Sequence, residues 1–248
     1  MTTVAMINKK GGVGRTTLAL HLAHYASELG IKTLAVSLER HGTIPYWMSG
    51  GEEPPEEQVV WIRPHLGFVH SPYEIPEYPD ATLVIYDCPP MFEIRDLEDD
   101  ARPRLAFKPL HPVWSAPPPK PGKYMHWRPG ARPADFWIIP TPAHPPALEL
   151  LDESLGELAP LGGMVRCALY QPWKPAAVAL PALRDRVSRY SNVEILDHVV
   201  PESPRFFEAE NQRRLIWEGP QDDSDQAAAV MRGLCGEILT HCGLSPRC

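Results

Sequence analysis

The sequence predicts an α/β fold in which a doubly wound, mostly parallel sheet carries helices on both faces. Short apolar runs that suit buried strands recur along the chain and end in polar or proline-rich turns, at residues 4–7, 32–38, 83–86 and 136–139. Between the first two runs, residues 16–29 place apolar side chains at helical spacing, and Gly30 ends the helix. A strand, a crossover helix and a second strand form the unit from which parallel sheets are built.

The second half of the chain continues this alternation. We expect strands over residues 164–169 and 193–200, and helices over residues 176–190 and 224–242. Ligands of doubly wound sheets bind outside the carboxyl ends of the strands, so we expect the functional site at that edge.

The chain is expected to form one domain over residues 1–248, with an insertion at about residues 101–133. The insertion is proline-rich and basic, because it holds seven Lys or Arg residues and no acid. We interpret it as a surface loop that is either a tolerated insertion or a binding segment.

The composition is that of a globular protein, since 44% of the 248 residues are hydrophobic and 22% are charged. A formal net charge of −7 argues against general coating of nucleic acid but allows a local basic patch. The five cysteines include no CxxC pair, which favours a reducing compartment. With neither an apolar run of membrane-spanning length nor a signal segment, we expect a cytoplasmic protein.

A glycine-rich loop lies between the first strand and the first helix, with the sequence Asn8, Lys9, Lys10, Gly11, Gly12, Val13, Gly14, Arg15, Thr16 and Thr17. Glycines let successive backbone NH groups point at an anion, and the helix adds the positive end of its dipole, so this loop is predicted to cradle phosphates. The loop departs from an ordinary P-loop, because Lys9 stands at the first glycine position and Arg15 replaces the phosphate-binding lysine.

Two oxygen-bearing side chains are placed to hold Mg²⁺ beside such a loop. Thr16 follows Arg15 directly, where a P-loop hydroxyl binds the metal. Asp87 ends the apolar run 83–86, where an acid from another strand holds the water shell of the metal. The agreement of these motifs is stronger support for a nucleotide site than the glycine pattern alone.

Several motifs together resemble the ParA/MinD family of deviant Walker A P-loop ATPases: the loop from Lys10 to Thr17, Glu39 after the second strand, Asp87 with Cys88-Pro89-Pro90, and Ile139-Pro140-Thr141-Pro142. Residues 200–209 resemble the family's passage from strand to helix near the adenine, which implies that Pro201 and Glu202 contact the nucleotide. The resemblance covers nearly the whole chain except the insertion.

The resemblance implies binding of ATP and Mg²⁺ and an ATP-dependent homodimer in which Lys10 reaches the phosphates of the other subunit. It also implies that Glu39 orients the attacking water, that the dimer binds DNA nonspecifically, and that a ParB-like or other small adaptor protein stimulates hydrolysis. The commonest role of such proteins is plasmid or chromosome partition. Membrane attachment is not expected, because residues 227–248 lack a basic amphipathic helix.

The departures from the family pattern bear on catalysis. The family has lysine at Arg15, and it has Asp-x-Asp where this chain has Ser37, Leu38 and Glu39. Guanidinium and ammonium groups do not occupy the same point, and Glu39 is one methylene longer than aspartate. Small misplacements of this kind cost on the order of 100-fold in rate, so we expect ATP binding with slow or absent hydrolysis.

The resemblance places nonspecific DNA contacts in the C-terminal third, through phosphate neutralisation. The candidate residues there are arginines, namely Arg184, Arg186, Arg189, Arg205, Arg213 and Arg214. A solvated helix face balanced by Asp185, Glu208 and Glu210 explains the same residues equally well.

The leading hypothesis is therefore a cytoplasmic, dimerising ParA-like ATPase that partitions DNA or positions another large cargo, and that associates with the nucleoid if it binds DNA. An alternative is an ATP-binding scaffold without turnover that recruits a partner through the proline-rich insertion. A biosynthetic enzyme on the same fold is a third alternative, for which the sequence displays no substrate pocket.

Overall fold

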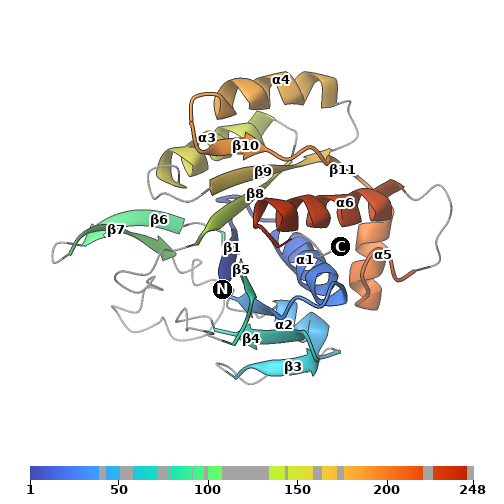
Figure 1. The fold of residues 1–248 in the computed structure, drawn as a ribbon. Coiled ribbons are helices and arrows are strands. Elements are labelled where there is room, and N and C mark those ends of the chain that lie inside the picture. The colour runs from blue at the N-terminus through green and yellow to red at the C-terminus, as the bar shows by residue number, and fades with distance from the viewer. Residues whose placement is uncertain are drawn as a thin grey trace, which may run out of the picture.

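The structure is a computed structural model that describes residues 1–38, 43–50, 58–71, 78, 80–90, 92–97, 100–107, 134–142, 145–158, 164–171, 176–219 and 226–244. The strands of its main sheet are β1 (Thr2–Met6), β2 (Thr33–Ser37), β3 (Val60–Arg63), β4 (Leu66–His70), β5 (Leu83–Asp87), β8 (Phe136–Pro142), β9 (Met164–Gln171), β10 (Val193–Ile195) and β11 (Val200–Pro201). They follow the order β10-β9-β8-β1-β5-β2-β4-β3, with β11 paired to β9 (Figure 1).

The pairings of the sheet confirm the predicted doubly wound architecture. All neighbouring strands are parallel except β3 and β4. The expected strand over residues 193–200 is divided into β10 and β11, which both pair with β9. The central register sets Met6 and Ser37 opposite Asp87, so the carboxyl ends of β1, β2 and β5 meet at one edge.

The helices are α1 (Arg15–Glu28), α2 (Thr43–Met48), α3 (Pro145–Leu158), α4 (Ala176–Val187), α5 (Pro204–Gln212) and α6 (Gln226–His241). One face of the sheet packs against α3 and α4, and the opposite face packs against α1, α2, α5 and α6 (Figure 1). Neighbouring strand residues therefore enter different cores. Trp137 lies in the core under α3 and α4, whereas Ile138 lies in the core under α1 and α6.

The first seven residues of the expected insertion are a strand rather than a loop. Residues 101–107 belong to β7 (Asp100–Phe107), which pairs antiparallel with β6 (Phe92–Leu97) in a separate two-stranded sheet. Pro103 falls beside the register shift of this ladder, and a two-stranded sheet consists of edge strands, where proline is tolerated. The remainder of the expected insertion, residues 108–133, lies outside the described residues.

A buried histidine connects α1 to the segment that follows α5. The Nδ1 atom of His21 lies 2.6 Å from the carbonyl oxygen of Thr17, and its Nε2 atom accepts a hydrogen bond of 3.0 Å from the backbone NH of Ile216. The proton therefore lies on Nδ1. Burial lowers the pKa of His21 to about 4. Burial, with the nearby charge of Arg63, also lowers the pKa of His24 to about 4.

Within the described part of the chain, none of the helices combines the length and the apolar character needed to cross a bilayer.

Acidification from about pH 7 to about pH 5 is expected to lower the free energy of unfolding. His21 and His24 are protonated near their ordinary pKa of 6.5 in the unfolded chain. In the folded chain they resist protonation until the pH falls to about 4. The loss approaches 1.4 kcal/mol per pH unit for each histidine, as an order of magnitude, and urea unfolding at both pH values measures it. The free energy of unfolding of the His21→Gln variant should depend less steeply on pH than that of the wild type. An identical pH dependence in the two proteins would contradict the lowered pKa of His21.

Candidate functional site

The loop between β1 and α1 adopts a conformation that depends on glycine. Gly12 has φ +68° and Gly14 has φ +86°, a region that residues with a side chain rarely adopt. Gly14 is the N-cap of α1, so the first NH groups of the helix follow it directly. A Cβ atom built on Gly11 or Gly12 meets no atom within 4 Å, which leaves space for a ligand against the backbone.

Asn8 fixes this loop to the sheet. Its Oδ1 atom accepts a hydrogen bond of 2.8 Å from the backbone NH of Lys10, and its Nδ2 atom donates one of 2.8 Å to the carbonyl of Pro140 in β8. The residue is 1% exposed. Sequence reasoning gave Asn8 no role of its own, although a polar residue directly after a buried strand is a signal for one.

Arg15 holds the loop from the inside. Its Nη1 atom donates hydrogen bonds of 2.9 Å to the carbonyl of Asn8 and 2.7 Å to the carbonyl of Lys10. The residue is 5% exposed. The guanidinium therefore neutralises the partial negative charge of loop carbonyls, and this contact explains how arginine fits where the family has lysine.

The two lysines of the loop have different surroundings. Lys9 forms ion pairs with Glu157 and Glu153 of α3, the second at 3.7 Å, so its side chain is directed toward its own subunit. Lys10 is half-buried and follows it in the loop. The predicted contact of Lys10 with a second subunit remains a prediction.

The two expected metal ligands are in contact. The Thr16 hydroxyl donates a hydrogen bond of 2.8 Å to Oδ2 of Asp87, which is fully buried at the end of β5. Both side chains offer hard oxygen donors, which fit Mg²⁺. Ser37 pairs with Asp87 in the sheet register, and its buried hydroxyl has no hydrogen-bond partner among the described residues. Glu39 lies outside the residues that the structure describes.

A cavity of about 370 Å³ opens beside the loop. It is lined by the residues of the loop and by residues of α1, α2 and α5: Gly12, Val13, Gly14, Arg15, Thr16, Thr17, Leu20, His21, Thr43, Trp47, Phe206, Ala209 and Glu210. Pro201 and Glu202 are not among the lining residues, so their predicted contact with a nucleotide remains a prediction. Sequence reasoning missed Trp47, because it assigned no helix over α2 (Thr43–Met48). It gave Phe206 no role of its own, although Phe206 falls within residues 200–209.

A clasp of polar contacts joins α2 to α5. The indole Nε1 of Trp47 donates a hydrogen bond of 3.1 Å to the carbonyl of Glu210. Arg213, directly after α5, donates hydrogen bonds to the carbonyl of Gly50 and, at 3.0 Å, to the hydroxyl of Tyr46. Its guanidinium carbon lies 4.9 Å from the centre of the Tyr46 ring.

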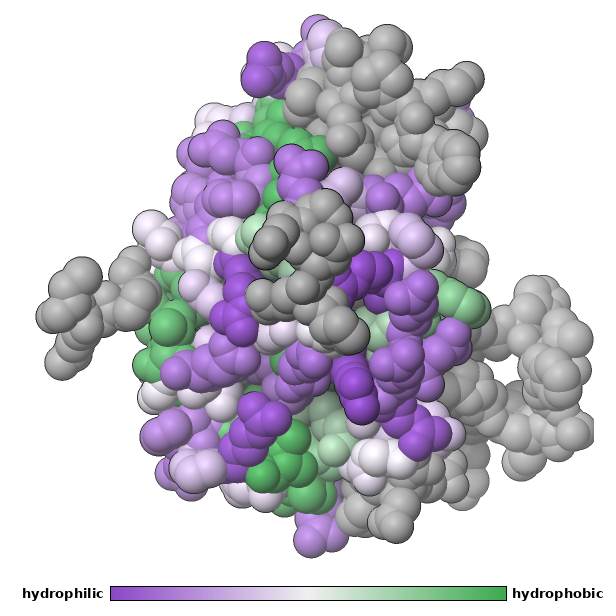
Figure 2. Space-filling view, turned by 90° about the vertical axis from the view of Figure 1, so that its right-hand side faces the viewer, coloured by the Kyte–Doolittle hydropathy of each residue, from purple (hydrophilic) through white to green (hydrophobic). Residues whose placement is uncertain are grey.

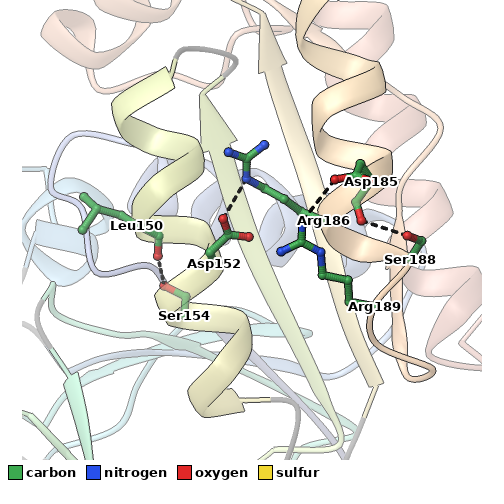
Figure 3. A network of polar contacts seen from close by, with 7 residues as sticks. All are labelled: Leu150, Asp152, Ser154, Asp185, Arg186, Ser188 and Arg189. Carbon is green, nitrogen blue, oxygen red and sulfur yellow. Dashed lines mark hydrogen bonds and ion pairs between the residues drawn. The ribbon is translucent and has the colours of Figure 1, made fainter.

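The candidate DNA-binding arginines do not form one surface. Arg184, Arg186 and Arg189 lie on or after α4, whereas Arg205, Arg213 and Arg214 lie on or after α5, across the sheet. The side where α5 and α6 lie is largely hydrophilic, with hydrophobic residues in separate patches (Figure 2). Figure 3 shows that Arg186 pairs with Asp152 of α3 at 2.8 Å and that Arg189 pairs with Asp185 at 3.1 Å.

A model of the CobQ/CobB/MinD/ParA nucleotide binding domain matches residues 4–216 of this chain. The chain belongs to this family. The chromosome-partitioning ATPase Soj of Thermus thermophilus is 36% identical over 67 residues, which are 27% of this chain and 27% of Soj. The chain thus aligns with about a quarter of the length of that relative.

Solved structures of MinD and McdA share the fold over nearly the whole chain. MinD from Pyrococcus horikoshii, complexed with Mg-ADP, has a TM-score of 0.67 at 13% identity, and 98% of each chain is covered. A Cyanothece McdA variant in complex with ATP has a TM-score of 0.60 at 16% identity, and 96% of each chain is covered. At such identities the likeness establishes the fold, and the chemistry has to be argued from the site.

Replacing Arg15 by alanine is expected to lower the free energy of unfolding by about 3 kcal/mol in the absence of nucleotide, because the buried carbonyl of Asn8 and the partly buried carbonyl of Lys10 lose a charged donor. Arg15→Lys keeps the charge without the planar fork and should lie between alanine and wild type. Urea unfolding measures both. Arg184→Ala, on the exposed surface of α4, is the control and should change stability by less than about 0.5 kcal/mol. If the Arg15→Ala variant were as stable as the wild type, Arg15 would not hold the loop in its conformation.

Proposed function

We propose that this protein binds ATP with Mg²⁺ at the loop before α1, dimerises across the bound nucleotide, and partitions DNA or positions another large cargo. The observation that carries the proposal is the contact of 2.8 Å between the Thr16 hydroxyl and Asp87 at the N-terminus of α1. An oxygen pair of this kind beside a glycine loop with positive φ angles suits a metal-bound phosphate chain.

Each part of the loop has a role in this proposal. The backbone NH groups from Gly11 to Arg15 and the dipole of α1 bind the phosphates, and Thr17 extends this cradle into the first turn. Thr16 and Asp87 would hold Mg²⁺, which supplies positive charge to the phosphates. Lys10 contacts the nucleotide of the partner subunit, and Glu39 orients the attacking water.

Hydrolysis is proposed to be slow. Ser37 occupies the position of a family acid, and its hydroxyl is buried beside Asp87 without adding a carboxylate to the site. A chain that binds ATP and turns it over only with DNA or an adaptor acts as an ATPase. A chain that never turns it over acts as a scaffold, with the proline-rich insertion as the segment that recruits its partner. ATP turnover measured with and without DNA separates these two functions.

The proposed partners are those of a partition ATPase. They are a second copy of the chain, nonspecific DNA, and a ParB-like or other small adaptor protein. McdA shares the fold of this chain, and the name of the sequence relative Soj assigns that protein to chromosome partitioning. In this proposal the protein is cytoplasmic and associates with the nucleoid through DNA.

Addition of Mg-ATP is expected to convert the wild-type protein into a dimer, as measured by sedimentation velocity. Lys10→Ala should still bind ATP but remain monomeric, because alanine cannot reach the phosphates of the other subunit. Lys9→Ala is the matched control and should dimerise, since Lys9 pairs with α3 of its own subunit.

Removal of Mg²⁺ by a chelator should weaken ATP binding. A wild-type protein with no measurable affinity for Mg-ATP would refute the proposal.

For the DNA step, we expect the α4 arginines to dominate. All of Arg184, Arg189 and Arg213 are exposed, but the ion pair of Arg189 is a local one with Asp185, whereas the Arg213 guanidinium is held by Gly50 and Tyr46 of a distant segment. Combined replacement of Arg184, Arg186 and Arg189 by alanine should weaken binding of the ATP-bound protein to duplex DNA. The logarithm of the DNA-binding constant decreases linearly with the logarithm of the salt concentration. The magnitude of this slope should be smaller by about 0.9 for each phosphate that the variant no longer neutralises. The same replacement of Arg205, Arg213 and Arg214 is the comparison. Unchanged DNA retention by the α4 variant would contradict this assignment.

A further inference from the structure

We propose that the outer edge of β10 binds an extended basic segment of another protein, which adds to the main sheet as a further strand. The site is separate from the loop before α1, so it does not depend on the proposed nucleotide binding. The partner is identified by its chemistry: an extended chain with backbone NH groups to donate, in which apolar and cationic side chains alternate.

A cavity of about 580 Å³ is lined by β10, by the link from β10 to β11, and by the C-terminal parts of α4 and α6. These two helices pack on opposite faces of the sheet. Among the described strands β10 is the last in the order, and Figure 1 shows it at the margin of the sheet. A cavity that is lined by β10 and by a helix from each face therefore lies along the edge of the sheet, as a groove with one helix on each side.

The edge is held in shape by α6. Glu237 accepts hydrogen bonds of 2.7 Å from the backbone NH of Asp197 and 3.2 Å from that of His198, directly after β10. The ring of His198 packs so close to Gly233 of α6 that no side chain fits at that position. An edge strand presents backbone groups that pair with an added strand, and here that edge is preorganised before a partner arrives.

The two sides of the groove differ in chemistry. On the side of α4, Val187 is buried and Ile195 packs into the same core. Side chains alternate along a strand, so Glu194 points to the opposite face, on the side of α6. Leu196, which lies in the core under α6, follows the same alternation. With Glu237 of α6 also lining the cavity, the groove is apolar toward α4 and acidic toward α6.

The lining carries an excess of negative charge. Three carboxylates face one guanidinium and one imidazole, namely Glu194, Asp197, Glu237, Arg184 and His241. Burial alone would raise the pKa of Glu237, but hydrogen bonds from Asp197 and His198 outweigh it and hold that pKa below its ordinary value, so the carboxylate stays charged. The C-terminal ends of α4 and α6 add partial negative charge. The groove therefore favours a cationic partner and repels the phosphates of DNA.

An added strand would satisfy both sides of the groove. Its successive side chains point toward α4 and toward α6 in turn. Apolar residues would lie against Val187 and Ile195, and the cations between them would face Glu194 and Glu237. In this mode of recognition the main-chain hydrogen bonds supply affinity and the alternate side chains supply specificity.

The test uses a peptide with blocked ends in which three lysines alternate with three valines, titrated calorimetrically into the full chain without nucleotide. The wild-type protein should bind it saturably. The double variant Glu194→Gln, Asp197→Asn should bind about fivefold more weakly at low salt, because each exposed ion pair contributes little by itself. The matched control removes two exposed carboxylates outside the cavity, by Glu149→Gln and Glu208→Gln, and should bind as wild type does.

Two methylated peptides test the strand itself. In a strand only alternate NH groups face the neighbouring strand, so N-methylation of either the lysines or the valines, but not of both in turn, should weaken binding, by about 10-fold. Equal effects of the two methylations would overturn strand addition. A peptide with glutamate in place of lysine should not bind, and equal affinity for it would refute the role of the acidic side.

Two results with the proteins would also overturn the proposal. They are the absence of saturable binding by the wild type, and unchanged affinity of the Glu194→Gln, Asp197→Asn variant. Neither result would bear on the binding of Mg-ATP at the loop before α1.

Discussion

The hydrogen bonds from the Arg15 guanidinium to the carbonyls of Asn8 and Lys10 set the shape on which the rest of the site depends. A loop with two glycines at positive φ has a large conformational entropy to lose, so it needs interactions that define one conformation. Arg15 is also the first residue of α1. The same side chain therefore fixes the loop relative to the helix whose N-terminal NH groups complete the anion site.

The sheet supplies the second constraint. Parallel pairing of β1, β2 and β5 brings Ser37 and Asp87 to the edge above which the loop turns. Asn8 extends this arrangement to β8 through its bond to Pro140. The position of the Asp87 carboxylate relative to Thr16 thus follows from backbone register, and it needs no flexible segment to hold it.

Much of the fold was predictable, because β1, α1, β2 and β5 show clear apolar runs and helical spacing. The contact between Thr16 and Asp87 was predictable from the chemistry of P-loops. The orientation of Arg15 was not, because sequence does not say whether a guanidinium binds a ligand or its own loop. The hairpin of β6 and β7 was missed because prolines favoured a loop, and Trp47 was missed because α2 has only six residues. The candidate DNA-binding arginines lie close together in the sequence, but α4 and α5 place them on opposite faces of the sheet.

The clasp between α2 and α5 has a mechanical consequence. Trp47 and Arg213 tie together two segments that are separated by 163 residues in the chain. A displacement of α2 or α5 therefore stretches the hydrogen bonds that join them, so the two helices move together. A load placed on either helix is therefore shared by the other.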